Sequence, residues 1–211
     1  MSTVILANGE FPKHPIPLAA LTNADTLIAC DGAAETLQKY GRSPDWVVGD
    51  LDSLSADFRK KFANRMIHEA EQETNDLSKA FRFALSQMDE NEELIILGAT
   101  GKREDHTLGN ISLLADFSRR FADIRLLTDT GVFLAVKSGQ TVPAVPGQAV
   151  SIFNPAGRAV RATSQGLKYP LNDLELNIWW CATLNTALTD HFSLTFTPED
   201  AVLLLFLAHS D

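Results

Sequence analysis

The chain has 211 residues, 45% of them apolar and 21% charged, a composition typical of a globular protein with one large domain or two small ones. The formal net charge of −9 argues against nucleic-acid binding through a broad basic face. It leaves room for a phosphate-rich ligand whose charge is offset by metal ions and local cations.

No export or membrane signal is found. The N-terminus has no basic region, and the longest apolar run, 201–208, is too short to cross a bilayer. Cys30 and Cys181 lie far apart within apolar stretches, so we expect reduced core thiols. These features predict a cytoplasmic protein that binds neither nucleic acid nor a membrane.

Over the first 130 residues, short apolar runs alternate with helical patterns. Strands are expected at 3–7, 26–30, 46–49, 66–69, 93–98 and 124–128, and helices at 33–41, 55–64, 75–88 and 107–121. This alternation predicts an α/β N-terminal domain, residues 1–137, with a mainly parallel sheet and helices on its faces. Ligands bind such sheets at the carboxyl ends of the strands.

After residue 130 the pattern changes to short β-type runs, broken by Gly, Pro or Asn at intervals of roughly 8 to 12 residues. This predicts a C-terminal all-β sandwich domain over residues 138–211. The last apolar segment is ambiguous, because Thr197 and Pro198 resemble a helix start while the run after them has no polar face. We expect a buried strand there.

Two aspartates, Asp50 and Asp52, follow the apolar run 46–49 directly. In an extended segment their side chains would point the same way, with Cα atoms about 7 Å apart. Such a pair suits Mg²⁺, which is usually held by one or two carboxylates and substrate phosphates. The alternative is a turn in which Asp52, Ser53 and Ser55 cap the next helix. A Ser55 cap is compatible with both.

Acidic residues also precede the helix expected at 75–88. Three acids and Gln72 lie just before it, and Asp76 lies in its first turn. By itself this segment is typical of a solvated face, with Asp76 complementing the helix dipole.

A glycine-rich segment, 98–110, follows the strand at 93–98. Gly98 and Gly101 precede Lys102, Arg103 and a helix, an arrangement compatible with a phosphate cradle and also with an ordinary strand-to-helix turn. The segment is not a Walker A loop. Asp105 could hold the Arg103 guanidinium or help to bind a metal. His106 is more typical of a helix N-terminus than of catalysis.

Further polar residues follow two other strands: Asn8 and Gly9 after the first, and Asp31 and Gly32 after the second. Each pair could be a simple turn. Together with the acids and the glycine-rich segment, however, they converge on one edge of the sheet and predict a Mg²⁺–nucleotide site.

The segments 31–54, 72–80, 98–114 and 164–173 resemble, in order and spacing, those of thiamin pyrophosphokinases. The resemblance implies transfer of a pyrophosphoryl group from ATP to the hydroxyethyl group of thiamin, giving thiamin diphosphate and AMP, with Mg²⁺ as cofactor. It also implies a homodimer with active sites between subunits, and a C-terminal domain that serves in thiamin binding and dimerisation.

The resemblance also implies roles for individual residues. The metal ligands would be Asp50, Asp52 and Asp76, which together with Arg103 and Asp105 would form the catalytic set. The nucleotide site would comprise Asn8, Asp31, Gly32, Gly101, Lys102, Arg103 and Asp105. Thiamin would contact Gln72 and Asn185.

The chain departs from the family pattern near residue 184. Leu184 stands where the family has a serine, and Trp179 and Trp180 have no counterpart. Adjacent tryptophans in a strand would point to opposite faces, so we expect at least one to pack in the core.

Three other functions are compatible with parts of the pattern. One is a nucleotide-sugar transferase that holds its metal with Asp50 and Asp52. A haloacid-dehalogenase-type phosphatase is disfavoured, because its Asp-x-Asp is followed by Gly-Thr rather than Ser-Leu. The third is a non-catalytic module that binds a nucleotide or thiamin.

Overall fold

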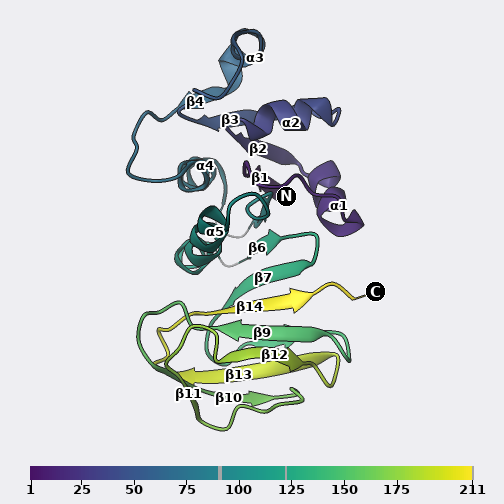
Figure 1. The fold of residues 1–211 in the computed structure, drawn as a ribbon, viewed down its shortest axis with the longest axis vertical. Coiled ribbons are helices and arrows are strands. Elements are labelled where there is room, and N and C mark those ends of the chain that lie inside the picture. The colour runs from purple at the N-terminus through teal and green to yellow at the C-terminus, as the bar shows by residue number, and fades with distance from the viewer. Residues whose placement is uncertain (90–91, 122, 211) are drawn as a thin grey trace. The chain divides into compact units, whose positions relative to one another are not determined.

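The computed structural model describes residues 1–89, 92–121 and 123–210, and the chain divides into two compact units, Met1–Asp129 and Thr130–Asp211 (Figure 1). The division lies before the predicted boundary at 137/138. The physical reason is that β7 (Gly131–Val136) pairs antiparallel with β14 (Leu203–Ala208) along its whole length.

The first unit contains a sheet of parallel strands in the order β6-β5-β1-β2-β3-β4. Their bounds are β1 Ser2–Leu6, β2 Thr26–Cys30, β3 Trp46–Gly49, β4 Met66–His68, β5 Glu93–Leu97 and β6 Ile124–Leu127. The six predicted strands are confirmed to within a residue or two, because short, almost wholly apolar runs are typical of strands buried on both faces.

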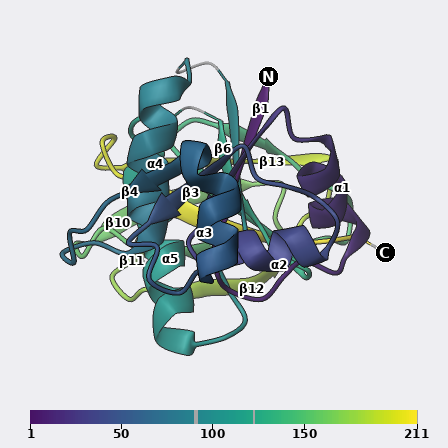
Figure 2. The ribbon, with the colours of Figure 1, turned by 90° about the horizontal axis from the view of Figure 1, so that it is seen from above.

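Helices cover both faces of this sheet. Helices α1 (Pro15–Asn23) and α2 (Ala33–Lys39) lie on one side, whereas α4 (Asp76–Gln87) and α5 (Glu104–Phe117) lie on the other (Figures 1 and 2). Helix α3 (Ala56–Phe62), followed by the short 3₁₀ helix Ala63–Arg65, joins β3 to β4. The α/β prediction for this unit is therefore confirmed.

Helices α4 and α3 show why these segments are helical. In α4, the buried residues Leu77, Ala80, Phe81 and Ala84 recur at the spacing that places side chains on one helical face. Helix α3 begins at the predicted cap, because Ser55 Oγ accepts a hydrogen bond from the Phe58 N–H at 3.3 Å.

Two helix predictions need correction. Helix α1 was not predicted. It has Pro15 at its first position and His14 as its cap, and it can form because prolines in the first turn disrupt no helical hydrogen bond. Helix α5 begins at Glu104 rather than at 107, because the acids in its first turn suit the positive end of the helix dipole.

The order of the strands fixes where a ligand can bind. From β1 the chain proceeds through β2, β3 and β4 on one side, and β5 and β6 pair on the other side of β1. The strand order therefore changes direction between β1 and β5. Such a switch point is where open α/β sheets bind their ligands.

The second unit is an antiparallel β sandwich, as predicted. One layer has the strand order β12-β9-β14-β7 and the other β11-β10-β13-β8. The remaining bounds are β8 Thr141–Pro143, β9 Ala149–Phe153, β10 Val160–Gln165, β11 Leu174–Leu176, β12 Ala182–Thr186 and β13 His191–Thr197. The last apolar segment is strand β14, as expected.

The tryptophan pair differs from its prediction. Trp179 and Trp180 lie in a turn before β12, not in a strand, so the opposite-face argument does not apply to them. The Trp179 ring lies 5.5 Å from that of Phe153, whereas Trp180 is 62% exposed. No helix of the described residues is long and apolar enough to cross a membrane.

Candidate active site

A pocket of about 340 Å³ lies in the first unit, a volume at the lower end of those that hold small-molecule ligands. It is lined by residues that follow β1, β3 and β5 and by the beginnings of α4 and α5. The carboxylates Asp50 and Asp76, and the cations Lys79, Lys102 and Arg103, all line it. The pocket therefore occupies the switch-point edge that the sheet order predicts.

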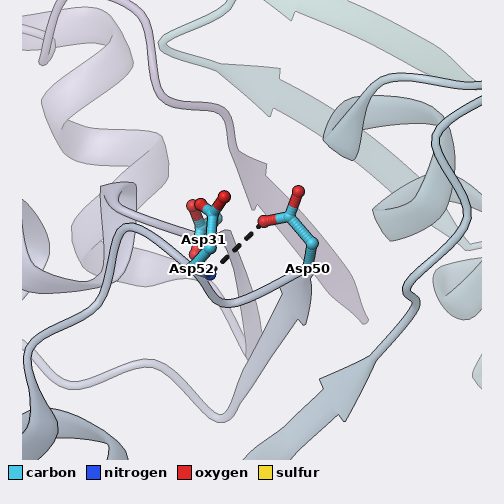
Figure 3. A group of neighbouring side chains, drawn as sticks. All are labelled: Asp31, Asp50 and Asp52. Atoms are coloured by element: carbon cyan, nitrogen blue, oxygen red, sulfur yellow. Dashed lines mark hydrogen bonds between the residues drawn. The ribbon is translucent and has the colours of Figure 1, made fainter.

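Three aspartates meet at this edge. Asp31, Asp50 and Asp52 each offer a carboxylate oxygen, and these three atoms lie within 4.8 Å of one another (Figure 3). Asp31 follows β2 and Asp50 follows β3, and the two strands are neighbours in the sheet. Three anionic groups this close repel one another unless a cation lies between them, so the cluster suits a hard divalent ion.

The backbone brings Asp50 and Asp52 together in a way that the sequence analysis did not predict. Leu51, between them, has a φ of 63° and a buried side chain, so the segment turns instead of remaining extended. The Asp52 N–H also donates to Asp50 Oδ1 at 3.4 Å. The turn alternative and the metal alternative are thus compatible.

Asp31 is the most deeply buried acid of the cluster, with 5% of its surface exposed. Its Oδ2 accepts a hydrogen bond from the Ser53 hydroxyl, whereas its Oδ1 has no hydrogen-bond partner in the described part of the chain. A buried carboxylate oxygen without a partner is costly for the fold alone. This oxygen is the strongest structural sign that the cluster receives a ligand.

Asp76 lies beside the cluster, in the first turn of α4. Its Oδ1 accepts a hydrogen bond at 3.2 Å from Lys79 Nζ, and Lys79 is only 1% exposed. Burial raises the pKa of the Asp76 carboxyl, the Lys79 charge lowers it, and the charges of Asp50 and Asp31 raise it further. Lys79 is therefore a buried cation at the edge of a strongly anionic site.

Gln72 lies on the other side of Asp50. Its Nε2 donates to Asp50 Oδ2 at 3.2 Å, and this hydrogen bond is the main reason that the pKa of Asp50 is lowered. Gln72 also lines the pocket, and its contact with thiamin stays a prediction.

The loops after β1 and β5 touch through their backbones. The Gly9 N–H donates to the Gly98 carbonyl, and a Cβ on Gly9 would lie 2.2 Å from that oxygen. Gly101 has a φ of 95°, and a Cβ there would meet Glu10. Lys102 Nζ closes the contact by donating to Asn8 O and Asn8 Oδ1. Glycine is thus required for close approach here.

Arg103 and Asp105 form the pair that the sequence analysis allowed. Arg103 Nε and Nη2 donate to the two Asp105 carboxylate oxygens, at 3.1 and 2.6 Å, and the arginine holds the pKa of Asp105 down at about 2. Both side chains are largely exposed. Since a guanidinium has five donors, Arg103 can still meet an anion in the pocket that it lines.

Asn185 is placed differently from the other predicted site residues. It is buried in the second unit, and its Oδ1 accepts hydrogen bonds from the N–H groups of Tyr169 and Thr186. Its Nδ2 donates to the Tyr169 carbonyl. The amide is thus used to hold the segment around Tyr169, and its contact with thiamin stays a prediction.

The residues of the pocket lining that were not predicted include Lys79, Asn110 and Cys30. Lys79 lies on the buried face of α4, and Asn110 donates to the Ala99 carbonyl at 2.8 Å and accepts from Asn75. Cys30 is buried as predicted, and burial raises the pKa of its thiol, but it also borders the pocket. A lysine within an otherwise apolar helical face was the available signal for Lys79.

A parallel sheet with carboxylates, glycine-bordered loops and cations around one strand-end pocket places the chain among α/β proteins whose strand-end site suits a divalent metal and a phosphate-containing ligand. Two family models match it: the catalytic domain of thiamin pyrophosphokinase over residues 18–127, and the substrate-binding domain of thiamin pyrophosphokinase over residues 131–203. The chain belongs to the thiamin pyrophosphokinase family.

Individual relatives support this family membership. The chain is 29% identical to the thiamine pyrophosphokinase of Bacillus subtilis over 213 residues, covering 97% of this chain and 98% of the relative. It is 28% identical to thiamin pyrophosphokinase 1 of Caenorhabditis elegans, covering 83% and 76%. The crystal structure of the B. subtilis protein superposes with a TM-score of 0.81 at 23% identity, covering all of both chains, and supports the fold.

Proposed function

We propose that this chain transfers the pyrophosphoryl group of ATP to the hydroxyl group of thiamin, giving thiamin diphosphate and AMP. The observation that carries the proposal is the cluster of Asp31, Asp50 and Asp52, with its unpartnered buried oxygen, beside the pocket of a chain in this family. The nucleotide-sugar transferase would need only the Asp-x-Asp pair. The comparisons do not favour that alternative.

The residues present fit a magnesium ion. All three donors of the cluster are carboxylate oxygens, the ligand type that Mg²⁺ prefers, and the buried Asp31 Oδ1 lacks any other partner in the described chain. Asp76 lies beside them, so Asp31 joins Asp50, Asp52 and Asp76 among the proposed ligands. When bound, the ion would neutralise phosphate charge and favour attack at phosphorus.

The protein's own groups position the two substrates. The thiamin hydroxyl oxygen forms a bond to the β-phosphorus of ATP, the bond from that phosphorus to the bridging oxygen of the α-phosphate breaks, and AMP leaves with that oxygen. The hydroxyl proton passes to a carboxylate of the site. Such a reaction depends mainly on alignment and on neutralising charge.

The cations of the loop after β5 suit the nucleotide. Lys102 is held against Asn8, and Arg103 is fixed by its two hydrogen bonds to Asp105. A fixed guanidinium loses little freedom on meeting a phosphate oxygen. We therefore assign Asn8, Gly32, Gly101, Lys102, Arg103 and Asp105 to the ATP side of the site, with Arg103 offsetting the charge of the transferred group or of the leaving AMP.

We assign thiamin to the side of the pocket near Gln72, and we propose that the active protein is a homodimer. In the second unit, Ile178, Trp180, Leu184 and Leu188 expose large apolar side chains, Leu184 to 84%. A second copy would cover such side chains. Light scattering of the wild type and of Trp180→Glu would test this: a wild-type monomer would contradict it.

The cytoplasmic location remains a prediction from the sequence. It agrees with the two cysteines, Cys30 and Cys181, which are both free thiols.

The experiment that tests the activity is chromatographic measurement of AMP formed from ATP. We expect AMP only when thiamin and Mg²⁺ are both present, in equal amounts with thiamin diphosphate. EDTA should stop the reaction, and added Mg²⁺ should restore it. Wild-type protein that forms no AMP under these conditions would contradict the proposal, and turnover of a UDP- or GDP-sugar would favour the transferase instead.

A further inference from the structure

The loop between β4 and α4, residues 69–75, carries Gln72 and is held by hydrogen bonds of its own. We define it as the Gln72 loop. It begins with the Glu69 N–H donating to the Gly49 carbonyl at 2.9 Å, and it ends with Asn75 capping α4 through the Ser78 N–H. Gln72 is the residue between these ends that contacts Asp50.

Glu71 binds the inside of this loop. Its Oε2 accepts from the backbone N–H groups of Glu73 and Thr74, at 2.7 and 3.0 Å. Its Oε1 accepts from the Thr74 hydroxyl. Thr74 and Arg82 are among the groups that lower the pKa of Glu71 to about 2, so the carboxylate is ionised at neutral pH. The side chain thus fixes the backbone directly after Gln72.

Arg82, on α4, ties the loop to the helix. Its Nη2 donates to Glu69 at 2.6 Å and to Glu71 at 2.8 Å, and its Nη1 donates to Thr74 Oγ1 at 3.1 Å. One guanidinium therefore holds both ends of the segment that contains Gln72. Arginine suits this task because its donors lie in one rigid plane, whereas lysine offers a single point charge.

We propose that Glu71 and Arg82 are positioning residues that hold Gln72 at the thiamin side of the site. Neither is among the residues that line the pocket. Glu71 acts through the backbone N–H groups of Glu73 and Thr74, and Arg82 acts through the side chains of Glu69, Glu71 and Thr74. The Glu69–Arg82–Glu71 arrangement would otherwise be an exposed ion-pair group of little value to stability. The inference rests on the proposed function, in which Gln72 contacts thiamin.

The first test is steady-state kinetics of Glu71→Gln, Arg82→Lys and Arg82→Met. We expect each to raise the KM for thiamin, by about 10-fold for Arg82→Met, while the KM for ATP and the Mg²⁺ requirement stay near the wild-type values. Arg82→Lys should recover only part of the loss. In the Gln72→Ala background the Arg82→Met change should add little, because coupled residues give non-additive effects.

Arg125→Met provides the matched control. Arg125 is 45% exposed against 44% for Arg82, and it also bridges two acids, Asp123 and Glu93, but it lies away from the pocket lining. We expect its kinetics to match the wild type. If Arg82→Met gave the same kinetics as Arg125→Met, or lowered kcat through loss of folded protein while both KM values stayed unchanged, the inference would be overturned.

The second test does not need activity. Amide hydrogen exchange at Glu73 and Thr74 should be about 10-fold faster in Glu71→Gln and Arg82→Met, and unchanged in Arg125→Met. Unchanged exchange in the two loop variants would overturn the inference even if the enzyme were active. A wild type that forms no AMP would instead contradict the proposed function, and the exchange result would still decide the loop's role.

Discussion

The two units differ in one kind of buried polar group: among the described residues, only the first unit buries a carboxylate that lacks full hydrogen bonding. In the second unit the buried Asn154 and Asn185 have both their amide nitrogen and oxygen hydrogen-bonded to the backbone. In the first unit, Asp31 Oδ1 is buried without a partner in the described chain, within a cluster of three carboxylates, and the buried Lys79 is paired with a fourth, Asp76. Polar burial stabilises the first arrangement and opposes the second.

This contrast separates structural polar groups from binding groups. A buried amide whose nitrogen and oxygen both bind the backbone serves the fold rather than a ligand. A buried carboxylate with an empty oxygen contributes to function only if a cation or a donor arrives. The substitutions below test the contrast, because they should affect activity in the first unit and stability in the second.

The largest effect is expected for Asp50→Asn. Loss of one metal-binding carboxylate should lower kcat/KM by about 1,000-fold. The free energy of unfolding without Mg²⁺ should not fall, since repulsion among the three carboxylates is relieved. AMP formation and urea unfolding measure the two quantities. The control is Asp116→Asn, an exposed change on α5. Near-normal turnover of Asp50→Asn would show that Asp50 serves the turn and does not bind the metal.

A smaller loss of kcat/KM is expected for Lys79→Met. Removing this buried cation raises the pKa of Asp76 further and leaves the carboxylates without compensation, so Mg²⁺ binding and kcat/KM should fall by about 10- to 100-fold. A Mg²⁺ titration of the reaction rate measures the change. Lys60→Met, an exposed change in α3, should leave it unaltered. An unshifted titration for Lys79→Met would show that Asp76 does not depend on this lysine.

For Asn185→Ala the effect should be on stability. Three backbone groups of Tyr169 and Thr186 lose their partner, so the free energy of unfolding should fall by about 1–3 kcal/mol. Chemical denaturation measures it, with the exposed Asn177→Ala as control. Unchanged stability together with a raised KM for thiamin would make Asn185 a binding residue and would break the contrast between the units.

The smallest effect concerns pH and the Gln72 loop. Because the pKa of Glu71 is lowered from 4.5 to about 2, its stabilising effect is complete above pH 4.5 and is lost as the pH falls towards 2. Amide protection of Glu73 and Thr74, corrected for intrinsic exchange, should therefore be constant at neutral pH and fall over that range. Glu71→Gln should show no such step. The same step in that variant would assign it to another acid.

The residues of the candidate site show which parts of it the sequence pattern predicted. Asp50, Gln72, Asp76, Lys102 and Arg103 were predicted from polar residues after apolar runs and from the family resemblance, and all line one pocket. Lys79 and Asn110 were missed because the contacts of a side chain on a helix depend on how that helix packs in the tertiary structure. Glu71 was interpreted as part of a solvated face, although its carboxylate organises the loop.

The sequence by itself determined the strands of the parallel sheet, the change to a sandwich and the order of the motifs, because apolar period and turn residues are local properties. Only the tertiary structure decided that Asp31 joins Asp50 and Asp52, and that the Asn185 amide binds the backbone of Tyr169 and Thr186. These outcomes depend on contacts between residues distant in the chain and on the left-handed turn at Leu51. The local sequence pattern contains no information about those long-range contacts or about that turn.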